Sequence, residues 1–230
     1  MRNSRLHLLP VCLLLFGCAN SSSFSSSGYD PNLYEFDDGS LSYNVVSEGK
    51  VGVIGFSKEW DGNGDIEVPE VAEGYSVVAI LESAFEGNDG LEKIKLPDSL
   101  SYIEQNAFYD CVSLQEVDLG DGLSEIGDFA FAGATSLASI ELPSALLSLG
   151  EGCMANADAL DAIIIPSGVT TIGPKAFEND AQLTIYCEAG QTPSGWDSSW
   201  NLDGGTAYFY SETQTDGYWH YDSSGNPVLW

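Results

Sequence analysis

An alanine-phenylalanine motif returns along this chain with one fixed period. It stands at positions 84–85, 107–108, 130–131 and 176–177, and Cys153-Met154 occupies the place of one further copy. The motif therefore recurs every 23 residues. An aliphatic residue precedes each motif by four positions, and a leucine follows each alanine by seven. These two columns are Ile80, Ile103, Ile126, Leu149 and Ile172, and Leu91, Leu114, Leu137, Leu160 and Leu183. Such a period predicts stacked coils that share one core.

Each of these leucines begins a run in which apolar residues recur three and five positions later. The pairs are Ile94/Leu96, Val117/Leu119, Ile140/Leu142 and Ile163/Ile165, and each is followed by a proline or a glycine. Alternate apolar residues that end at a proline predict a short strand with an inward apolar side. We interpret the alanine-phenylalanine motif as one short helical turn. The sequence therefore predicts a β-dominated leucine-rich-repeat solenoid with one strand and one helical turn in each coil.

The best-matched coil carries a family resemblance. Residues 103–114 read I-E-Q-N-A-F-Y-D-C-V-S-L. They resemble the consensus I-x-x-x-A-F-x-x-C-x-x-L of the BspA-like (Treponema-type) leucine-rich repeats of bacterial surface proteins. The resemblance covers about residues 66–187. It implies the solenoid fold, and for function it implies only adhesion or ligand binding, because such repeats are reused for many partners.

The segments beside the repeats are interpreted as caps. Residues 29–79 form an N-terminal cap and a first irregular repeat, with predicted strands at 50–54 and 65–69. The regular repeats occupy 80–187, and 188–230 form an aromatic C-terminal cap with a hairpin turn in its last ten residues, at Ser223-Ser224-Gly225-Asn226. A solenoid needs such caps because its end coils otherwise expose the shared core.

Residues 1–17 have the pattern of a bacterial lipoprotein signal peptide. Two arginines precede an apolar run at 6–16, which is too short to span a bilayer. The run ends in L-F-G-C, which resembles the lipobox and implies a lipid on Cys18. Residues 18–28 then form the lipidated cysteine and a serine-rich tether. The alternative is an ordinary signal peptide, with Cys18 as an incidental thiol.

The charge balance limits the partners. The chain has 35 acidic and 7 basic side chains, which gives a formal net charge of −28. Such a surface repels phosphate backbones and anionic headgroups, so we expect no nucleic acid, and no membrane contact except through the lipid anchor. The predicted partner is an extracellular or envelope protein, bound by a monomer. A passive coat or scaffold without a ligand is a further alternative.

The residue types do not favour catalysis. The chain has two histidines, and one of them lies in the predicted signal peptide, so histidine pairs for catalysis or for a transition metal are excluded. Carboxylate pairs are abundant, but they fall on repeat positions that face solvent. The sequence therefore predicts no enzyme, no cofactor and no metal.

One segment begins like a calcium loop. Residues 61–65 read D-G-N-G-D, but the sixth and twelfth positions of the loop hold Ile66 and Ala72 instead of glycine and glutamate. A turn between two strands accounts for the same residues. We therefore interpret the segment as a turn.

The cysteines beyond position 18 are Cys111, Cys153 and Cys187. In a protein outside the cytoplasm, three cysteines allow one disulfide and one reactive thiol. Cys111 and Cys153 lie two coils apart, about 10 Å along the stack, which is beyond the reach of a disulfide. Buried free thiols are the favoured interpretation.

The outward side chains of the repeat strands form two columns that we interpret as the ligand-binding face. One column holds Lys93, Glu116, Ser139 and Ala162, and the other holds Lys95, Asp118, Glu141 and Ile164. Ion pairs are expected between Lys93 and Glu116 and between Lys95 and Asp118. The columns become apolar at Ala162 and Ile164, near Tyr186, and this end is a candidate docking patch. Cover by the C-terminal aromatic residues is the alternative reading. The candidate ligand-binding residues are Lys93, Lys95, Glu116, Asp118, Glu141, Ala162, Ile164 and Tyr186.

An alternative site lies near the C-terminus. Residues 217–225 read G-Y-W-H-Y-D-S-S-G and are similar to the hairpins of choline-binding cell-wall modules. The similarity implies carbohydrate or cell-wall binding through Tyr218, Trp219 and Tyr221, because aromatic rings bind sugar faces and quaternary ammonium groups. Such modules use several consecutive hairpins, whereas one is visible here.

Overall fold

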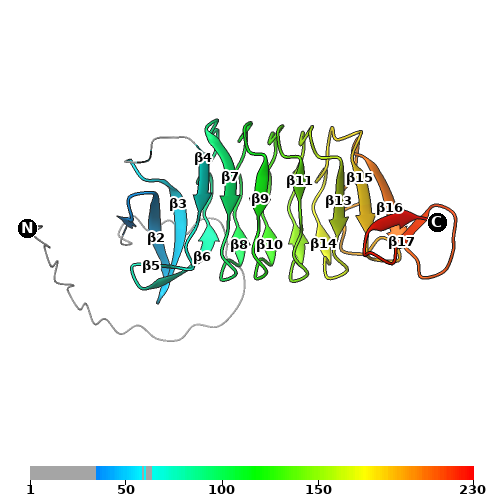
Figure 1. The fold of residues 1–230 in the computed structure, drawn as a ribbon, viewed down its shortest axis with the longest axis horizontal. Helices are drawn as coiled ribbons and strands as arrows, with labels where there is room; N and C mark the ends of the chain where they lie inside the picture. The colour runs from blue at the N-terminus through cyan, green and yellow to red at the C-terminus, as the bar shows by residue number, and fades with distance from the viewer. Residues whose placement is uncertain (1–34, 59, 61–63) are drawn as a thin grey trace, which may run out of the picture.

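The chain folds into a row of stacked coils, seen here in a computed structural model that describes residues 35–58, 60 and 64–230 (Figure 1). The described residues contain strands, turns and bends but no helix, so no helix in this part of the chain is long and apolar enough to cross a membrane. Neighbouring coils pair at the period that the sequence predicts, as Glu116 does with Ser139 and Glu125 with Ser148. The predicted solenoid is confirmed.

The predicted repeat strands form one side of the stack, which we name the strand face. They are β4 (Gly64–Glu67), β7 (Leu91–Lys95), β9 (Glu116–Asp118), β11 (Ser139–Ile140), β13 (Ala162–Ile165) and β15 (Thr184–Cys187), and β16 (Thr206–Tyr210) continues the row. All pair in parallel with their neighbours, except that no ladder joins β11 to β13 within the described chain. The strand face therefore consists of two sheets that meet at this point.

The other side of the stack is a nine-stranded sheet, which we name the short-strand sheet. In the coils it consists of the two-residue strands β8 (Tyr102–Ile103), β10 (Glu125–Ile126), β12 (Ser148–Leu149) and β14 (Thr171–Ile172). It continues toward the N-terminus through β6 (Tyr75–Ile80), β3 (Lys50–Phe56), β2 (Leu41–Ser47) and β1 (Glu35–Asp37), and β5 (Val71–Ala72) pairs with β6. The sequence pattern identified Ile103 and its equivalents as core residues but did not predict the two-residue strands β8, β10, β12 and β14.

The alanine-phenylalanine motif is not a helical turn, and this expectation is wrong. The amides of Asn106, Phe108 and Asp110 donate to carbonyl oxygens of the next coil at 2.8 to 2.9 Å. The amides between them donate back by three residues, as Tyr109 does to Asn106 at 3.0 Å. Asn106 and Asp110 adopt positive φ angles of 56° and 53°, which lets alternate amides point along the stack. A helix cannot form because it would need these same amides for its own hydrogen bonds.

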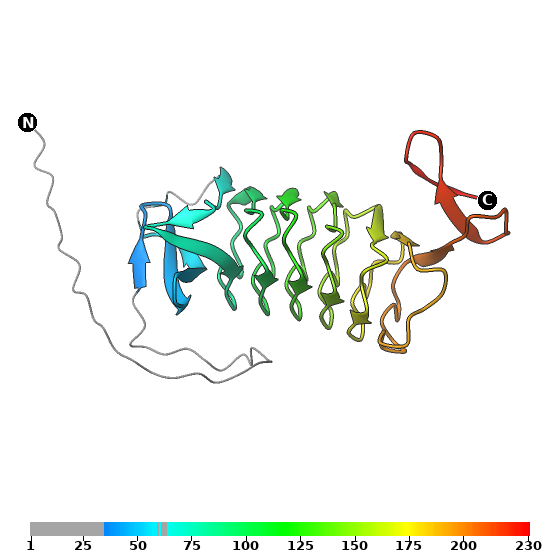
Figure 2. The same cartoon turned by 90° about the horizontal axis from the view of Figure 1, so that it is seen from below.

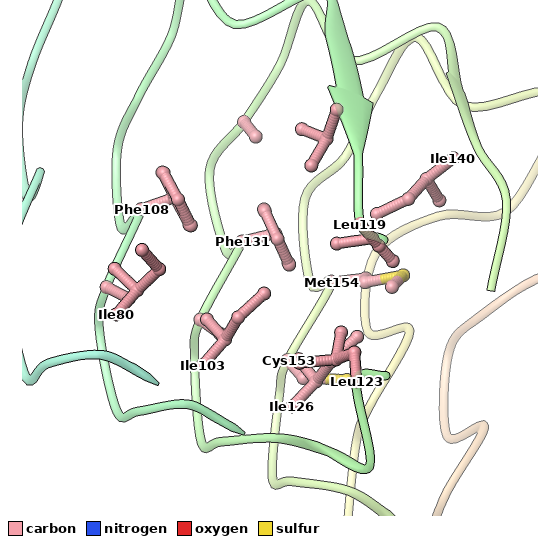
Figure 3. Packing of buried hydrophobic residues seen from close by; sticks show 14 of the residues in the cluster. Ile80, Ile103, Phe108, Leu119, Leu123, Ile126, Phe131, Ile140, Cys153 and Met154 are labelled. Atoms are coloured by element: carbon pink, nitrogen blue, oxygen red, sulfur yellow. The ribbon is translucent and has the colours of Figure 1, made fainter. Parts of the chain in front are cut away.

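The core lies between the two sides and follows the predicted columns. Phe108 and Phe131 stack with ring centroids 5.0 Å apart and an interplanar angle of 3°, and Met154 continues the column in the next coil (Figure 3). Ile80, Ile103 and Ile126 form a second column beside the rings, and all of these side chains are buried (Figure 3). Because each ring lies against equivalent rings of its neighbours, the hydrophobic free energy is shared between coils.

The flanking segments contain the strands that the sequence predicts. Residues 50–54 lie in β3, and 65–67 lie in β4. At the C-terminus, β17 (Tyr218–Tyr221) and β18 (Pro227–Leu229) form an antiparallel hairpin that projects from the end of the row (Figure 2). Their role as caps stays a prediction. The predicted signal peptide, Cys18 and the tether lie outside the described residues, as does most of the calcium-like segment at 61–65.

The three cysteines of the described chain are free and buried, as predicted. Cys111 occupies a small core position, and its thiol lies 3.1 Å from the carbonyl oxygen of Phe85. Burial raises the pKa of Cys111 and of Cys187 to about 12, and it raises the pKa of Cys153 as well. These thiols therefore stay protonated and unreactive at neutral pH.

Candidate functional site

The charged end of the strand face contains one of the two expected ion pairs. Lys93 of β7 and Glu116 of β9 lie side by side in the parallel ladder, and Lys93 Nζ is 2.9 Å from Glu116 Oε2. The hydrogen bond from Lys93 to Glu116 raises the pKa of the lysine. Both side chains are about half exposed or more, so water screens the pair and it contributes little to stability.

The second expected ion pair, between Lys95 and Asp118, does not form, and this prediction is wrong. Lys95 lies in register with Asp118 on one side and with Glu67 on the other, and its Nζ bonds to Glu67 Oε1 at 2.8 Å. Sequence analysis missed this partner because Glu67 belongs to the irregular first coil, whose register shifts between Gly64 and Asp65. Asp118 and Glu141 are exposed, and no ion pair forms with either in the described residues.

The C-terminal end of the strand face brings the predicted apolar residues together. Ile164 of β13 lies in register with Tyr186 of β15 and with Tyr208 of β16, and the two tyrosine rings are 6.3 Å apart. All three side chains are half-buried, and Ala162 on the same side of β13 is exposed. Tyr208 was not among the candidate ligand-binding residues, and it belongs to the segment 188–230 that was predicted to be the aromatic C-terminal cap. We name Ala162, Ile164, Tyr186 and Tyr208 the apolar patch.

The C-terminal hairpin covers one edge of the apolar patch. The Trp219 ring meets Tyr186 edge-on at 5.4 Å and Tyr210 edge-on at the same distance, and the Trp219 side chain is fully buried. Its indole N–H donates to the carbonyl oxygen of Cys187 at 2.9 Å. The alternative reading, in which C-terminal aromatics cover the patch, therefore holds at the Tyr186 end, whereas Ala162 stays open.

Trp219 does not fit the predicted glycan site, since a fully buried indole presents no ring face to a sugar. Tyr221 is 36% exposed, and its hydroxyl donates to Glu188 Oε1 at 2.6 Å. Burial raises the pKa of Tyr221, and the Glu188 carboxylate raises it further. Tyr218 is half-buried. Trp219 and Tyr221 thus anchor the hairpin to the stack, and the three predicted residues do not form an open aromatic cage.

The short-strand sheet carries a groove that sequence analysis missed. Its volume is about 990 Å³, and it extends from β3 across β6, β8 and β10 to β12. Among its lining residues are Lys50, Leu81, Tyr102, Glu104, Glu125 and Asp128. A neighbouring hollow of about 640 Å³ shares Asp128 and Gly150 with it. The only signal in the sequence is a glycine that recurs at 127 and 150, at the outward position after the buried aliphatic residue.

The structure does not form a metal centre in its described residues: no group of three histidine, cysteine or acidic side chains is placed to hold an ion. His220 stacks on Trp230 with ring centroids 3.5 Å apart and is half-buried. Asp180 is the buried acid of the core, with 5% of its surface exposed and neither carboxylate oxygen in a well-formed hydrogen bond within the described chain.

Comparison with known proteins identifies the repeat. A family described as "BspA type Leucine rich repeat region" matches residues 66–184 in six copies. Its boundaries agree with the coils described above.

Two solved structures are similar in sequence and in fold. A leucine-rich repeat protein of T. pallidum is 28% identical over 66% of this chain and 71% of its own, with a TM-score of 0.62. One from Bacteroides ovatus is 30% identical over 71% of this chain, with the same TM-score, and this chain spans 43% of its length.

A leucine-rich cell surface protein of Faecalibacterium prausnitzii, 21% identical over 85% of this chain and 60% of its own, has a TM-score of 0.58 and shares the fold. No curated protein matches the chain.

Proposed function

The chain belongs to the BspA-type leucine-rich repeat family, and we propose that it is a non-catalytic protein of the bacterial cell surface whose coils bind a protein partner. Repeat solenoids offer long surfaces that suit binding, and the family match covers every regular coil. The match supports a binding role in general. The partner class and the site below are our own inference from the described surface.

The proposed surface location rests on the N-terminal sequence. The apolar run and the L-F-G-C ending support export and a lipid on Cys18. A diacyl anchor holds a protein on a membrane because each buried methylene contributes roughly 0.8 kcal/mol. The test is metabolic labelling with an alkyne fatty acid in a bacterial host. The protein should take up the label and Cys18→Ser should not, whereas equal labelling of both would disprove the anchor.

The apolar patch on the strand face is the observation that carries the proposed site. Ile164, Tyr186 and Tyr208 come from three successive strands in one register, and Ala162 beside them is exposed. Elsewhere the same face presents charged residues such as Lys93, Glu116 and Asp118. An exposed apolar patch on an otherwise polar face is typical of a protein-binding site.

The experiment measures binding of the immobilised protein to a panel of extracellular-matrix and envelope proteins, beside purified cell-wall glycans. Ala162→Arg places a long charged side chain on the patch without removing core atoms, and Ile164→Asp removes its apolar centre. Both should weaken saturable binding of a protein by at least tenfold. Val112→Asp is the matched control, because Val112 is 43% exposed and lies on another part of the coil.

Three outcomes would contradict the proposal. Binding that survives Ala162→Arg would remove the site, and equal weakening by Val112→Asp would show an effect of net charge alone. Binding to glycans but to no protein would move the function to carbohydrate recognition. Trp219→Ala is not a useful probe of that alternative, since the loss of a fully buried indole would destabilise the hairpin.

A further inference from the structure

The groove on the short-strand sheet lies on a different side of the stack from the apolar patch. Its floor follows β8, β10 and β12, where the inward residues Ile103, Ile126 and Leu149 are buried in the core. The outward side chains Tyr102, Glu125 and Ser148 stand in one register along one wall. The opposite wall contains Glu82, Gln105 and Asp128.

Two glycines line the groove where neighbouring coils approach most closely. The outward position after the buried aliphatic residue is Gly127 in one coil and Gly150 in the next. A Cβ at Gly127 would lie 2.8 Å from the backbone nitrogen of Gln105, and one at Gly150 would lie 2.5 Å from that of Asp128. Close stacking of the coils therefore requires glycine at these two positions.

The charge of the groove is uncompensated. Four carboxylates line it, those of Glu82, Glu104, Glu125 and Asp128, against the single ammonium group of Lys50. The ion pairs of the described residues involve none of these five groups.

Burial and neighbouring negative charges both act on Glu104 in the groove. Burial raises the pKa of Glu104, the Glu82 amide opposes this by donating a hydrogen bond, and the charges of Glu82 and Glu125 raise it again. The neighbouring hollow adds Glu151 and Asp197, which extends the negative surface toward the C-terminus. A cation that enters the groove relieves this repulsion.

The dimensions of the groove suit an extended peptide. Strands of a sheet are about 4.8 Å apart, so the distance from β3 to β12 across four intervals is roughly 19 Å, which about six residues of extended chain would span. We propose that the groove binds an extended, lysine- or arginine-rich segment of another protein, with its basic side chains on the carboxylates of both walls. The proposal is independent of the apolar patch.

The charge of the chain itself argues against two other occupants. A second copy carries a formal charge of −28 and would bring further repulsion. Residues 19–34, the part of this chain that leads into the described fold, contain no basic side chain. A cationic segment from a different protein is therefore the complementary occupant.

The test measures binding of fluorescent six-residue peptides to the full chain by anisotropy at low and at physiological salt. A peptide of alternating lysine and alanine should bind at least tenfold more tightly than one of alternating glutamate and alanine. Its affinity should fall as salt rises, because the contacts are charged and partly exposed. The double variant Glu125→Gln with Asp128→Asn should weaken the lysine peptide by at least tenfold.

A matched control removes the same charge elsewhere. Glu92→Gln with Asp121→Asn neutralises two exposed acids outside the groove and should change the affinity by less than twofold. Ser148→Lys gives a second, independent test, since it places a cation inside the groove and should also weaken the peptide. Thermal midpoints of all variants establish that they are folded.

Specific results would overturn the proposal. Equal weakening by the control pair would show that total charge, not the groove, attracts the peptide. Unchanged binding in the Glu125 and Asp128 double variant or in folded Ser148→Lys would place the peptide elsewhere. Displacement of the peptide by an equal concentration of spermine, or by millimolar calcium, would show that any small cation suffices. Failure here leaves the apolar patch proposal untouched, because the two tests use different variants and different probes.

Discussion

The N-terminal and C-terminal coils differ in how closely they follow the repeat. In the N-terminal coils, Phe85, Phe108 and Phe131 stack in sequence with centroids 5.2 and 5.0 Å apart. In the C-terminal coils, Met154 takes the place of the next ring, and Phe177 meets Trp200 edge-on at 6.0 Å. The ladder of the strand face also stops in between, where β11 and β13 do not pair in the described chain.

The N-terminal and C-terminal coils also differ in the residues that they expose. The N-terminal coils present charged columns on the strand face and the acidic groove behind them, whereas the C-terminal coils present the apolar patch. A strictly repeated core fixes the coil spacing and leaves the outward positions free to vary. One scaffold thereby carries two chemically distinct surfaces, and the following variants test how far the two halves depend on each other.

The largest expected effect comes from the ring column. Phe131→Ala removes a fully buried ring that stacks on Phe108, and we expect a loss of about 3–5 kcal/mol in the free energy of unfolding. Chemical denaturation followed by circular dichroism measures it. If the halves share one core, unfolding stays a single transition at lower denaturant.

Met154→Leu is the matched change in the C-terminal half and should cost less than about 1.5 kcal/mol, since it conserves volume at the same column position. Two separate transitions in Phe131→Ala would show instead that the halves fold independently. A loss below that of Met154→Leu would mean that the stacked rings do not carry the core.

The next prediction concerns the pH dependence of stability. It compares the residues that occupy one core position in successive coils. The position held by Cys111, Ala134 and Ala157 is Asp180 in the following coil. Burial raises the pKa of Asp180 to about 7, although the Ala157 backbone opposes it, and the Asp158 carboxylate raises it further. The carboxyl group is therefore protonated in the folded protein at mildly acidic pH.

The sign of the effect follows from this raised pKa. The folded protein holds the proton more tightly than the unfolded chain, whose aspartate has a pKa near 3.8. The stabilisation is complete below about pH 4 and is lost as pH rises to about 7. Asp180→Ala should therefore be more stable than the natural protein at pH 8, by about 1–3 kcal/mol, and this difference should shrink toward pH 4.

Denaturation midpoints between pH 4 and 8 measure this difference. Asp161→Ala removes an exposed aspartate of the adjacent coil and should leave the profile unchanged. A variant profile parallel to that of the natural protein would show that Asp180 is not the titrating group.

The smallest effect concerns the charged end of the strand face. Lys93→Met should lower stability only slightly at low salt and not measurably at high salt, because the Lys93 and Glu116 side chains are 48% and 63% exposed. Lys95→Met breaks the equivalent pair with Glu67 and serves as the comparison. A loss of about 3–5 kcal/mol for either variant, the usual cost of breaking a buried pair, would show that these pairs hold the coils together.

The sequence predicted the core almost completely, and the surfaces only in part. Leu91, Ile94 and Phe108 are buried because a fixed period places the same side chain at the same depth in every coil. The short strands and the amide ladder of Asn106 and its neighbours were missed, because their hydrogen bonds run between coils and leave no local pattern.

The candidate site was predicted in outline. Ala162, Ile164 and Tyr186 do lie on one face, since alternate residues of parallel strands repeat at a fixed register. The partner of Lys95 was missed because a register shift in the first coil set it, and Trp219 was misjudged because its burial depends on where the hairpin folds back.

The sequence by itself determined the coil, its period and the identity of the residues that fill it. Only the tertiary structure decided which backbone amides join neighbouring coils, which acid pairs with Lys95, and that a groove opens over Gly127 and Gly150. The buried positions can be predicted from residue type, because every coil must supply the same apolar volume to the shared core. A groove is a space between residues of several successive coils, so it exists only once the coils are stacked.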